Sequence, residues 1–142
     1  MKWDDFFLGL CDYVAGMSKD PSTKVGAVIV RPDRTIASIG YNGFPRSTND
    51  APHLYEMREV KYLRTVHAEL NAILSAREPL HGYTIYVSPL HPCSNCTGAI
   101  IQSGINSVVA RVLSDPARWG ESFAQARSMF AEAGVTVVTR EK

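Results

Sequence analysis

His67-Ala68-Glu69-Leu70-Asn71-Ala72-Ile73 and Pro92-Cys93-Ser94-Asn95-Cys96 are the stretches that decide the fold of this chain of 142 residues. Both predict the start of a helix, the first because apolar residues recur at helical spacing and the second because it opens on a proline. A run rich in β-branched and aromatic residues over 83–87 predicts a strand between them. We therefore expect helices over 67–77 and 93–102 that begin at the ends of neighbouring strands.

The rest of the chain completes an α/β pattern. Apolar residues three and four apart predict an amphipathic helix over 3–18. Runs rich in Val and Ile predict strands over 24–30 and 35–40, paired as an antiparallel hairpin. The polar stretch from 46 to about 64 has little periodicity and predicts a long loop, a kind of segment that is often functional. The last expected elements are a strand over 106–112, a helix over 121–133 and a strand over 135–138. After the hairpin this alternation predicts a sheet covered by helices, with parallel strands in its second half.

Composition limits the classes of protein that the chain can belong to. With 45% hydrophobic and 20% charged residues and no marked boundary, it fits one globular domain over residues 1–142. A formal net charge of +1 argues against binding to long nucleic acid. The first five residues carry acids where a secretory signal carries bases, and no apolar run approaches the ~20 residues of a membrane span. We expect a cytoplasmic protein with no membrane partner.

Cysteine usage points to a metal site. The chain has three cysteines, Cys11, Cys93 and Cys96, and a C-x-x-C pair in an odd total favours a reduced metal site over a disulfide framework. Cys93 and Cys96 share one face of a helix start, where the helix dipole favours thiolates. Together with His67 they predict one Zn²⁺ per chain, with a fourth position open to water. The alternative is a closed structural site, whose fourth ligand would be Cys11, His53, His81 or His91. Cys11 is otherwise expected to be a small buried residue.

Glu69 follows His67 by two residues, so its carboxylate is not needed as a ligand. Zinc lowers the pKa of bound water to roughly 7, and a carboxylate beside that water can move a proton to a substrate ring nitrogen and then to departing ammonia. The pattern His-x-Glu…Pro-Cys-x-x-Cys is the signature of zinc-dependent nucleobase deaminases. We therefore predict that Glu69 is catalytic and that His67, Cys93 and Cys96 bind the metal.

Beyond this signature, the chain resembles the cytidine and deoxycytidylate deaminase family over nearly its whole length. The segments that carry the resemblance are Trp3-Asp4, Ser18-Lys19-Asp20-Pro21, Val25-Gly26-Ala27, Gly40-Tyr41-Asn42-Gly43, Lys61-Tyr62, Ile101-Gln102-Ser103-Gly104-Ile105 and Ala133-Gly134-Val135. The Gly-Tyr-Asn-Gly and Lys-Tyr segments indicate the branch that acts on nucleoside monophosphates. The resemblance implies a three-layer α/β/α fold with a five-stranded mixed sheet, and deamination of dCMP to dUMP and ammonia for thymidylate synthesis. It also implies a homo-oligomer, often a hexamer.

Substrate-binding residues can be nominated on the same basis. Asn42 matches a family position that contacts the sugar or the base, where an amide can both donate and accept; the plainer interpretation is a turn asparagine. Ala68, within the same motif as the ligand, is expected to contact substrate. The phosphate pocket is expected among Ser18, Lys19, Arg118 and Trp119. Exposed charges are the default for lysine and arginine, whereas a tryptophan in a loop suggests stacking on a base.

Many family members respond to dCTP and dTTP at a site between subunits, where Mg²⁺ would accompany a bound triphosphate. These members often carry an aromatic residue and an arginine beyond Ile73. Here Ser75 lacks the ring, Glu78 reverses the charge, and Arg77 would be a shifted substitute. We expect this regulation to be absent or built differently. The chain has no inserted Cys/His cluster for a second zinc.

Two alternatives stay open. The nearest is deamination of a 5-substituted dCMP, cytidine, free cytosine or tRNA adenosine, the last being disfavoured by the near-neutral charge. The other is a non-catalytic, zinc-stabilised nucleotide-binding module. The sequence does not separate dCMP from its 5-methyl or 5-hydroxymethyl form, because a single methyl needs only a small change of the pocket, worth ~1–3 kcal/mol.

Overall fold

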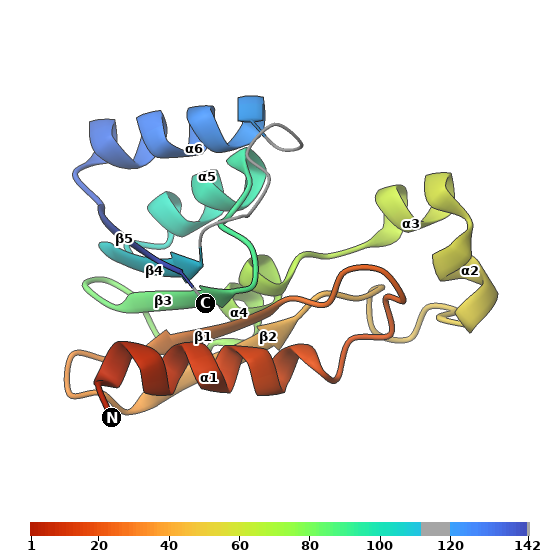
Figure 1. Ribbon diagram of the computed structural model, residues 1–142, viewed down its shortest axis with the longest axis horizontal. Coiled ribbons are helices and arrows are strands. Elements are labelled where there is room, and N and C mark those ends of the chain that lie inside the picture. The colour runs from red at the N-terminus through yellow and green to blue at the C-terminus, as the bar shows by residue number, and fades with distance from the viewer. Residues whose placement is uncertain (112–119, 142) are drawn as a thin grey trace.

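A five-stranded mixed sheet in the order β2-β1-β3-β4-β5 forms the centre of the computed structural model, which describes residues 1–111 and 120–141 (Figure 1). The strands are β1 Gly26–Val30, β2 Ile36–Tyr41, β3 Thr84–Ser88, β4 Ser107–Arg111 and β5 Thr136–Arg140. Strand β1 pairs antiparallel with both β2 and β3, whereas β3, β4 and β5 run parallel. The predicted antiparallel hairpin followed by parallel strands is confirmed.

Helices cover both faces of this sheet. They are α1 Trp3–Ala15, α2 Pro52–Glu56, α3 Arg58–Arg64, α4 Ala68–Ser75, α5 Ser94–Gln102 and α6 Gly120–Ala133. Because side chains alternate along a strand, Val28 of β1 packs with α1 on one face and Ile29 packs with α4, α5 and α6 on the other. In the described part of the chain, no helix is long and apolar enough to cross a membrane. The expected three layers, α/β/α, are confirmed.

Helix α4 lies unusually close to β2, and this approach positions its N-terminus. A Cβ atom on Gly40 would lie 2.5 Å from both the Ala68 carbonyl oxygen and the Ala72 amide nitrogen. A glycine in β2 therefore lets the two backbones meet without a side chain between them. His67, the residue immediately before α4, is held by the same contact.

The prediction of a loop from 46 to about 64 is wrong, because this stretch contains the short helices α2 and α3. Pro52 begins α2, as proline can at a first helical turn. Tyr55 then stacks on Phe44 with ring centroids 4.0 Å apart, and its hydroxyl accepts the Phe44 amide hydrogen at 3.1 Å. A single aromatic anchor, rather than a periodic apolar face, thus organises the segment.

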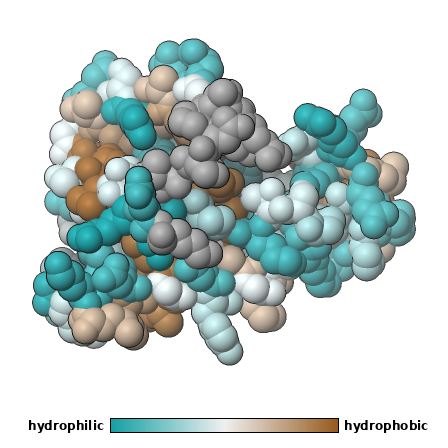
Figure 2. All heavy atoms as spheres, viewed as in Figure 1, coloured by the Kyte–Doolittle hydropathy of each residue, from teal (hydrophilic) through white to brown (hydrophobic). Residues whose placement is uncertain are grey.

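We call residues 52–64 the arm. The arm stands away from the sheet in Figure 1, and Figure 2 shows mainly hydrophilic residues over it. An antiparallel bridge between Gly43 and Val66 closes its base. The other predicted elements are present with boundaries within three residues of those expected; the first helix ends at Ala15, with Gly16 as its C-cap residue.

Candidate active site

The N-terminal ends of α4 and α5 bring three metal-ligand side chains together. His67 precedes α4, Cys93 precedes α5, and Cys96 lies in the first turn of α5. His67 Nδ1 is 3.4 Å from Cys93 Sγ and 3.3 Å from Cys96 Sγ, and the three donor atoms lie within 4.8 Å of one another. Zinc bonds of about 2.3 Å to sulfur and 2.0–2.1 Å to nitrogen separate N and S by roughly 3.5 Å in a tetrahedron. The spacing of the donors therefore fits a zinc ion.

The same group has three donors rather than four. In residues 1–111 and 120–141, no further Cys, His, Asp or Glu joins it. Cys11 lies in α1 on the opposite face of the sheet, where its thiol donates to the Tyr86 carbonyl oxygen. His91 contacts the Pro92 carbonyl oxygen through Nδ1, at 2.9 Å. Three ligands are typical of a catalytic zinc site that keeps a position open.

Electrostatics around the group favour metal binding and proton transfer. The hydrogen bond between the two thiols lowers the pKa of Cys93 and raises the pKa of Cys96, so Cys93 is the thiolate of the pair before a metal binds. The hydrogen bond to Cys93 in turn raises the pKa of His67. Glu69, 5% exposed in the first turn of α4, has its pKa raised to about 7 by burial. A carboxyl group with a pKa near neutrality can both accept and return a proton.

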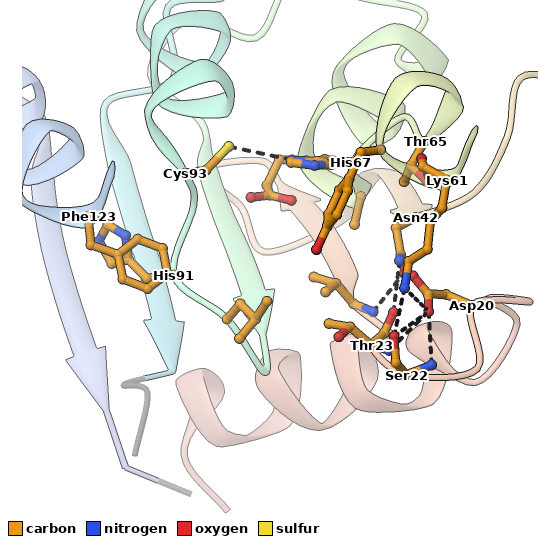
Figure 3. A pocket seen from close by; sticks show the side chains of 15 residues that line it. Asp20, Ser22, Thr23, Asn42, Lys61, Thr65, His67, His91, Cys93 and Phe123 are labelled. Atoms are coloured by element: carbon orange, nitrogen blue, oxygen red, sulfur yellow. Dashed lines mark hydrogen bonds and ion pairs between the residues drawn. The ribbon is translucent and has the colours of Figure 1, made fainter. Parts of the chain in front are cut away.

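A pocket opens beside Glu69 and has two opposite walls (Figure 3). His91 and Phe123 form part of one wall, and their rings meet edge to face with centroids 5.5 Å apart. The opposite wall comes from the segment before β1, from Asn42 after β2, and from the arm. The residues that line the pocket are Asp20, Ser22, Thr23, Val25, Asn42, Lys61, Tyr62, Thr65, His67, Ala68, Glu69, Leu90, His91, Cys93 and Phe123.

Asn42 and Ala68 line this pocket, as a substrate-binding role requires. The Asn42 side chain donates through Nδ2 to the Thr23 carbonyl oxygen and accepts from the Val25 amide through Oδ1, both at 2.9 Å. One of the two Nδ2 hydrogens is not used by these bonds. Asn42 therefore braces the segment before β1, and its contact with substrate stays a prediction.

Two of the four residues nominated for phosphate, Ser18 and Lys19, are among the described residues. Ser18 is buried and donates to the Asn42 carbonyl oxygen at 2.8 Å, while Lys19 is exposed and pairs with Asp50 at 2.5 Å. Neither lines the pocket. Arg118 and Trp119 lie outside the described residues.

Sequence reasoning missed Lys61 as a residue of the site. Its ammonium group reaches from the arm to Asp20 at 2.9 Å and to the Ser22 hydroxyl at 2.6 Å, and the side chain lines the pocket. The Lys-Tyr segment is part of the family resemblance, but the sequence alone does not predict that the Lys61 side chain lines the pocket. Only the folding of the arm brings residues 20 and 61 together.

A mixed sheet that presents a His-Cys-Cys group beside a buried glutamate defines the class of zinc-dependent deaminases. A family model, the cytidine and deoxycytidylate deaminase zinc-binding region, matches residues 1–112, and the chain belongs to this family.

Similar proteins share this family along most of the chain. The "Uncharacterized deaminase in luxG 3'region" of Aliivibrio fischeri is 45% identical, over 96% of this chain and 92% of that protein. The deoxycytidylate deaminase of Mus musculus is 38% identical, over 96% of this chain and 78% of that protein. The crystal structure of dCMP deaminase from the cyanophage S-TIM5 in apo form has a TM-score of 0.75 at 23% identity, covering 99% of this chain and 100% of that chain.

Proposed function

We propose that this protein deaminates dCMP to dUMP and ammonia and so supplies a precursor of thymidylate. The observation that carries the proposal is the buried Glu69 carboxyl group, which interacts with the His67, Cys93 and Cys96 group and lines the same pocket. The similarity to proteins named deoxycytidylate deaminase supports dCMP over other cytosine compounds.

His67, Cys93 and Cys96 would hold Zn²⁺, which when bound supplies the Lewis acidity that activates water at neutral pH. The Glu69 carboxylate takes a proton from the attacking water and delivers it to N3 of the cytosine ring. Glu69 then takes the remaining proton of the added water from the hydroxyl group at C4 and passes it to the 4-amino group, which leaves as ammonia. Water contributes the new oxygen at C4, so one water is consumed for each ammonia released. Burial of Glu69 keeps this proton away from bulk solvent.

Replacing Glu69 with Gln tests the proposal. The variant keeps the shape of the side chain, but a carboxamide can neither accept nor return a proton near neutral pH. We therefore expect kcat for dCMP to fall by about 10²–10⁴-fold. Metal analysis should still find one zinc per chain. Retained turnover in Glu69→Gln would contradict the assigned role.

Substrate choice is tested by steady-state rates of the zinc-loaded wild-type protein on dCMP, cytidine, 5-methyl-dCMP and 5-hydroxymethyl-dCMP. We expect the highest kcat/KM for dCMP. Comparable turnover of cytidine would contradict the nucleotide assignment. If no cytosine nucleotide releases ammonia, the protein is instead a zinc-stabilised binding module.

We also propose that residues 1–142 form one domain with one Zn²⁺, assembled as a homo-oligomer in the cytoplasm. The three free cysteines, two of them metal-ligand candidates, support a reducing compartment. Light scattering gives the subunit number. Rates measured with dCTP or dTTP in the presence of Mg²⁺ test for triphosphate regulation.

A further inference from the structure

We infer that Lys61 binds the 5′-phosphate of the substrate and that Asp20 positions Lys61 for this contact. The inference rests on the proposed function and adds the group that distinguishes a nucleotide from a nucleoside. The residues concerned belong to the wall of the pocket formed by the arm and the segment before β1. The proton transfers assigned to Glu69 involve none of the residues of this wall.

Charge is the first argument. Among the described residues that line the pocket, Lys61 is the one lysine or arginine. Lys19, the lysine expected from the sequence, points to Asp50 and is exposed. A phosphate monoester carries up to two negative charges and is recognised in proteins mainly by lysine, arginine and backbone amides. Within the described lining of this pocket, Lys61 is thus the group whose charge matches a phosphate.

The hydrogen bonds of Lys61 leave room for a ligand. An ammonium group has three N–H donors. In the described part of the chain, two of them are directed to Asp20 Oδ1 at 2.9 Å and to Ser22 Oγ at 2.6 Å. The third donor is available on a side chain that lines the pocket. Figure 3 shows Lys61 extended toward Asp20 and Ser22, on the side of the pocket away from His91 and Phe123.

The Asp20 carboxylate has hydrogen-bond donors besides Lys61. Its Oδ1 also accepts hydrogen bonds from the Ser22 amide at 2.9 Å, the Ser22 hydroxyl at 3.0 Å and the Thr23 amide at 3.1 Å. These donors satisfy the buried carboxylate, so Lys61 can turn part of its charge to a phosphate without leaving Asp20 unpaired. Asp20 therefore acts as a fixed anchor that orders a flexible lysine before the substrate arrives.

The position also suits the substrate. In cytosine nucleotides the reacting C4 lies at one end of the base, and the phosphate lies beyond the sugar. C4 must approach the group formed by His67, Cys93 and Cys96, which the arm does not contribute to. Lys61 comes from the arm and pairs with Asp20 in the segment before β1. It therefore lies on a different element from the three donor atoms that C4 must approach.

The test compares dCMP with deoxycytidine, which differ only by the phosphate. In Lys61→Met, kcat/KM for dCMP is expected to fall about 10- to 100-fold more than kcat/KM for deoxycytidine, as for loss of a charge-assisted hydrogen bond. Lys19→Met is the matched control, and its ratio of the two substrates should match that of the wild type. Equal losses on both substrates in Lys61→Met, or a selective loss in Lys19→Met, would overturn the inference.

Lys61→Met leaves a buried carboxylate without its cation and could weaken the fold. The double variant Asp20→Asn/Lys61→Met removes both charges and should show the same selective loss for dCMP. Asp20→Asn alone should raise KM for dCMP while kcat is kept, and should affect deoxycytidine less. A purely structural role of Asp20 would instead lower the rates on both substrates together.

Binding of the product separates this inference from the proposed function. Titration calorimetry with dUMP and deoxyuridine needs no turnover, so it works even if the protein deaminates neither substrate. We expect the affinity advantage of dUMP over deoxyuridine to shrink about 10-fold or more in Lys61→Met. If the wild type prefers dUMP and Lys61→Met keeps that preference, the role of Lys61 is wrong while the proposed function stands.

Discussion

Helices α4 and α3 both contribute to the pocket, and they are held in opposite ways. Helix α4 packs against β1 and β2 and buries Ala68, Glu69 and Ala72. Helix α3, in the arm, has no buried residue among its seven. The groups expected to carry out the reaction start from α4 and α5, whereas Lys61, expected to bind the phosphate, and Tyr62, which also lines the pocket, come from α3.

This difference separates the requirements of chemistry from those of recognition. A metal ligand set needs fixed distances, which helices packed on a sheet provide. A segment with few buried contacts opens locally at low cost in free energy, which suits a wall that admits and releases a nucleotide. Changes in the α4–α5 region should therefore lower kcat and stability, while changes in the arm should act mainly on KM.

Loss of a metal ligand should give the largest effect. In Cys96→Ala, two donors remain, so zinc content should fall below one per chain and the rate on dCMP should fall by roughly 10³-fold or more. Cys11→Ala is the matched control, because Cys11 lies on the opposite face of the sheet. It should keep zinc and activity and cost about 1 kcal/mol of stability. Zinc loss in Cys11→Ala would instead support a closed four-ligand site.

The next largest effect is expected where α4 meets β2. In Gly40→Ala, the added Cβ would lie 2.5 Å from the backbone of α4, so the helix must shift. We expect a loss of about 1–3 kcal/mol in the free energy of unfolding and a lower kcat, measured by urea denaturation and steady-state rates. Gly98→Ala, within α5, is the control: among the described residues its Cβ meets only Met129 Cε, at 3.9 Å. That variant should be more stable by about 0.5–1 kcal/mol.

The two regions also differ in how far the sequence predicts them. The α4–α5 region follows from local signals: helical spacing after His67, Pro92 at a helix start, and a strand between them. The ligand set could be nominated because metal chemistry restricts residue types and their spacing. The phosphate residues could not, because a lysine on the surface and a lysine in a pocket have the same sequence signature. Lys19 and Lys61 differ only in the partners that tertiary structure gives them.

The arm itself was missed for a related reason. Its helices are five and seven residues long and lack an apolar period, so periodicity predicts a loop. Pro52 was the one local sign of a helix start. What stabilises the arm is the contact between Tyr55 and Phe44, a pair separated by eleven residues, together with the bridge between Gly43 and Val66. Such contacts depend on the fold around them rather than on local propensity.

Loosening the arm should have a moderate effect that is confined to binding. In Tyr55→Phe the ring stack with Phe44 can persist, but the hydroxyl that accepts the Phe44 amide hydrogen is lost. We expect a cost of about 0.5–1.5 kcal/mol, a several-fold higher KM for dCMP and an unchanged kcat. Hydrogen exchange should show faster exchange in α2 and α3 but not in α4. A fall in kcat with KM kept would mean that the arm takes part in the chemistry.

The smallest effect at neutral pH concerns the ion pair that joins the arm to the segment before β1. Burial by itself raises the pKa of Asp20, but hydrogen bonds from Lys61, Ser22 and Thr23 outweigh it, so the pKa lies below its ordinary value of 3.8. The ionised carboxylate therefore stabilises the fold fully above about pH 4, and this stabilisation is lost as the pH falls through the lowered pKa.

Urea denaturation of the wild type and Asp20→Asn between pH 7 and pH 3 measures this contribution. The difference in stability should be constant from pH 7 to about pH 5 and should shrink below pH 4, as Asp20 is protonated first in the unfolded chain and then, at its lowered pKa, in the folded protein. Asp50→Asn is the control, because its partner Lys19 is exposed and water screens that pair. The difference in the free energy of unfolding between Asp50→Asn and the wild type should be smaller than that for Asp20→Asn at every pH from 7 to about 5. A gap for Asp20→Asn that stays constant or widens below pH 4 would show that Asp20 anchors the arm without its charge.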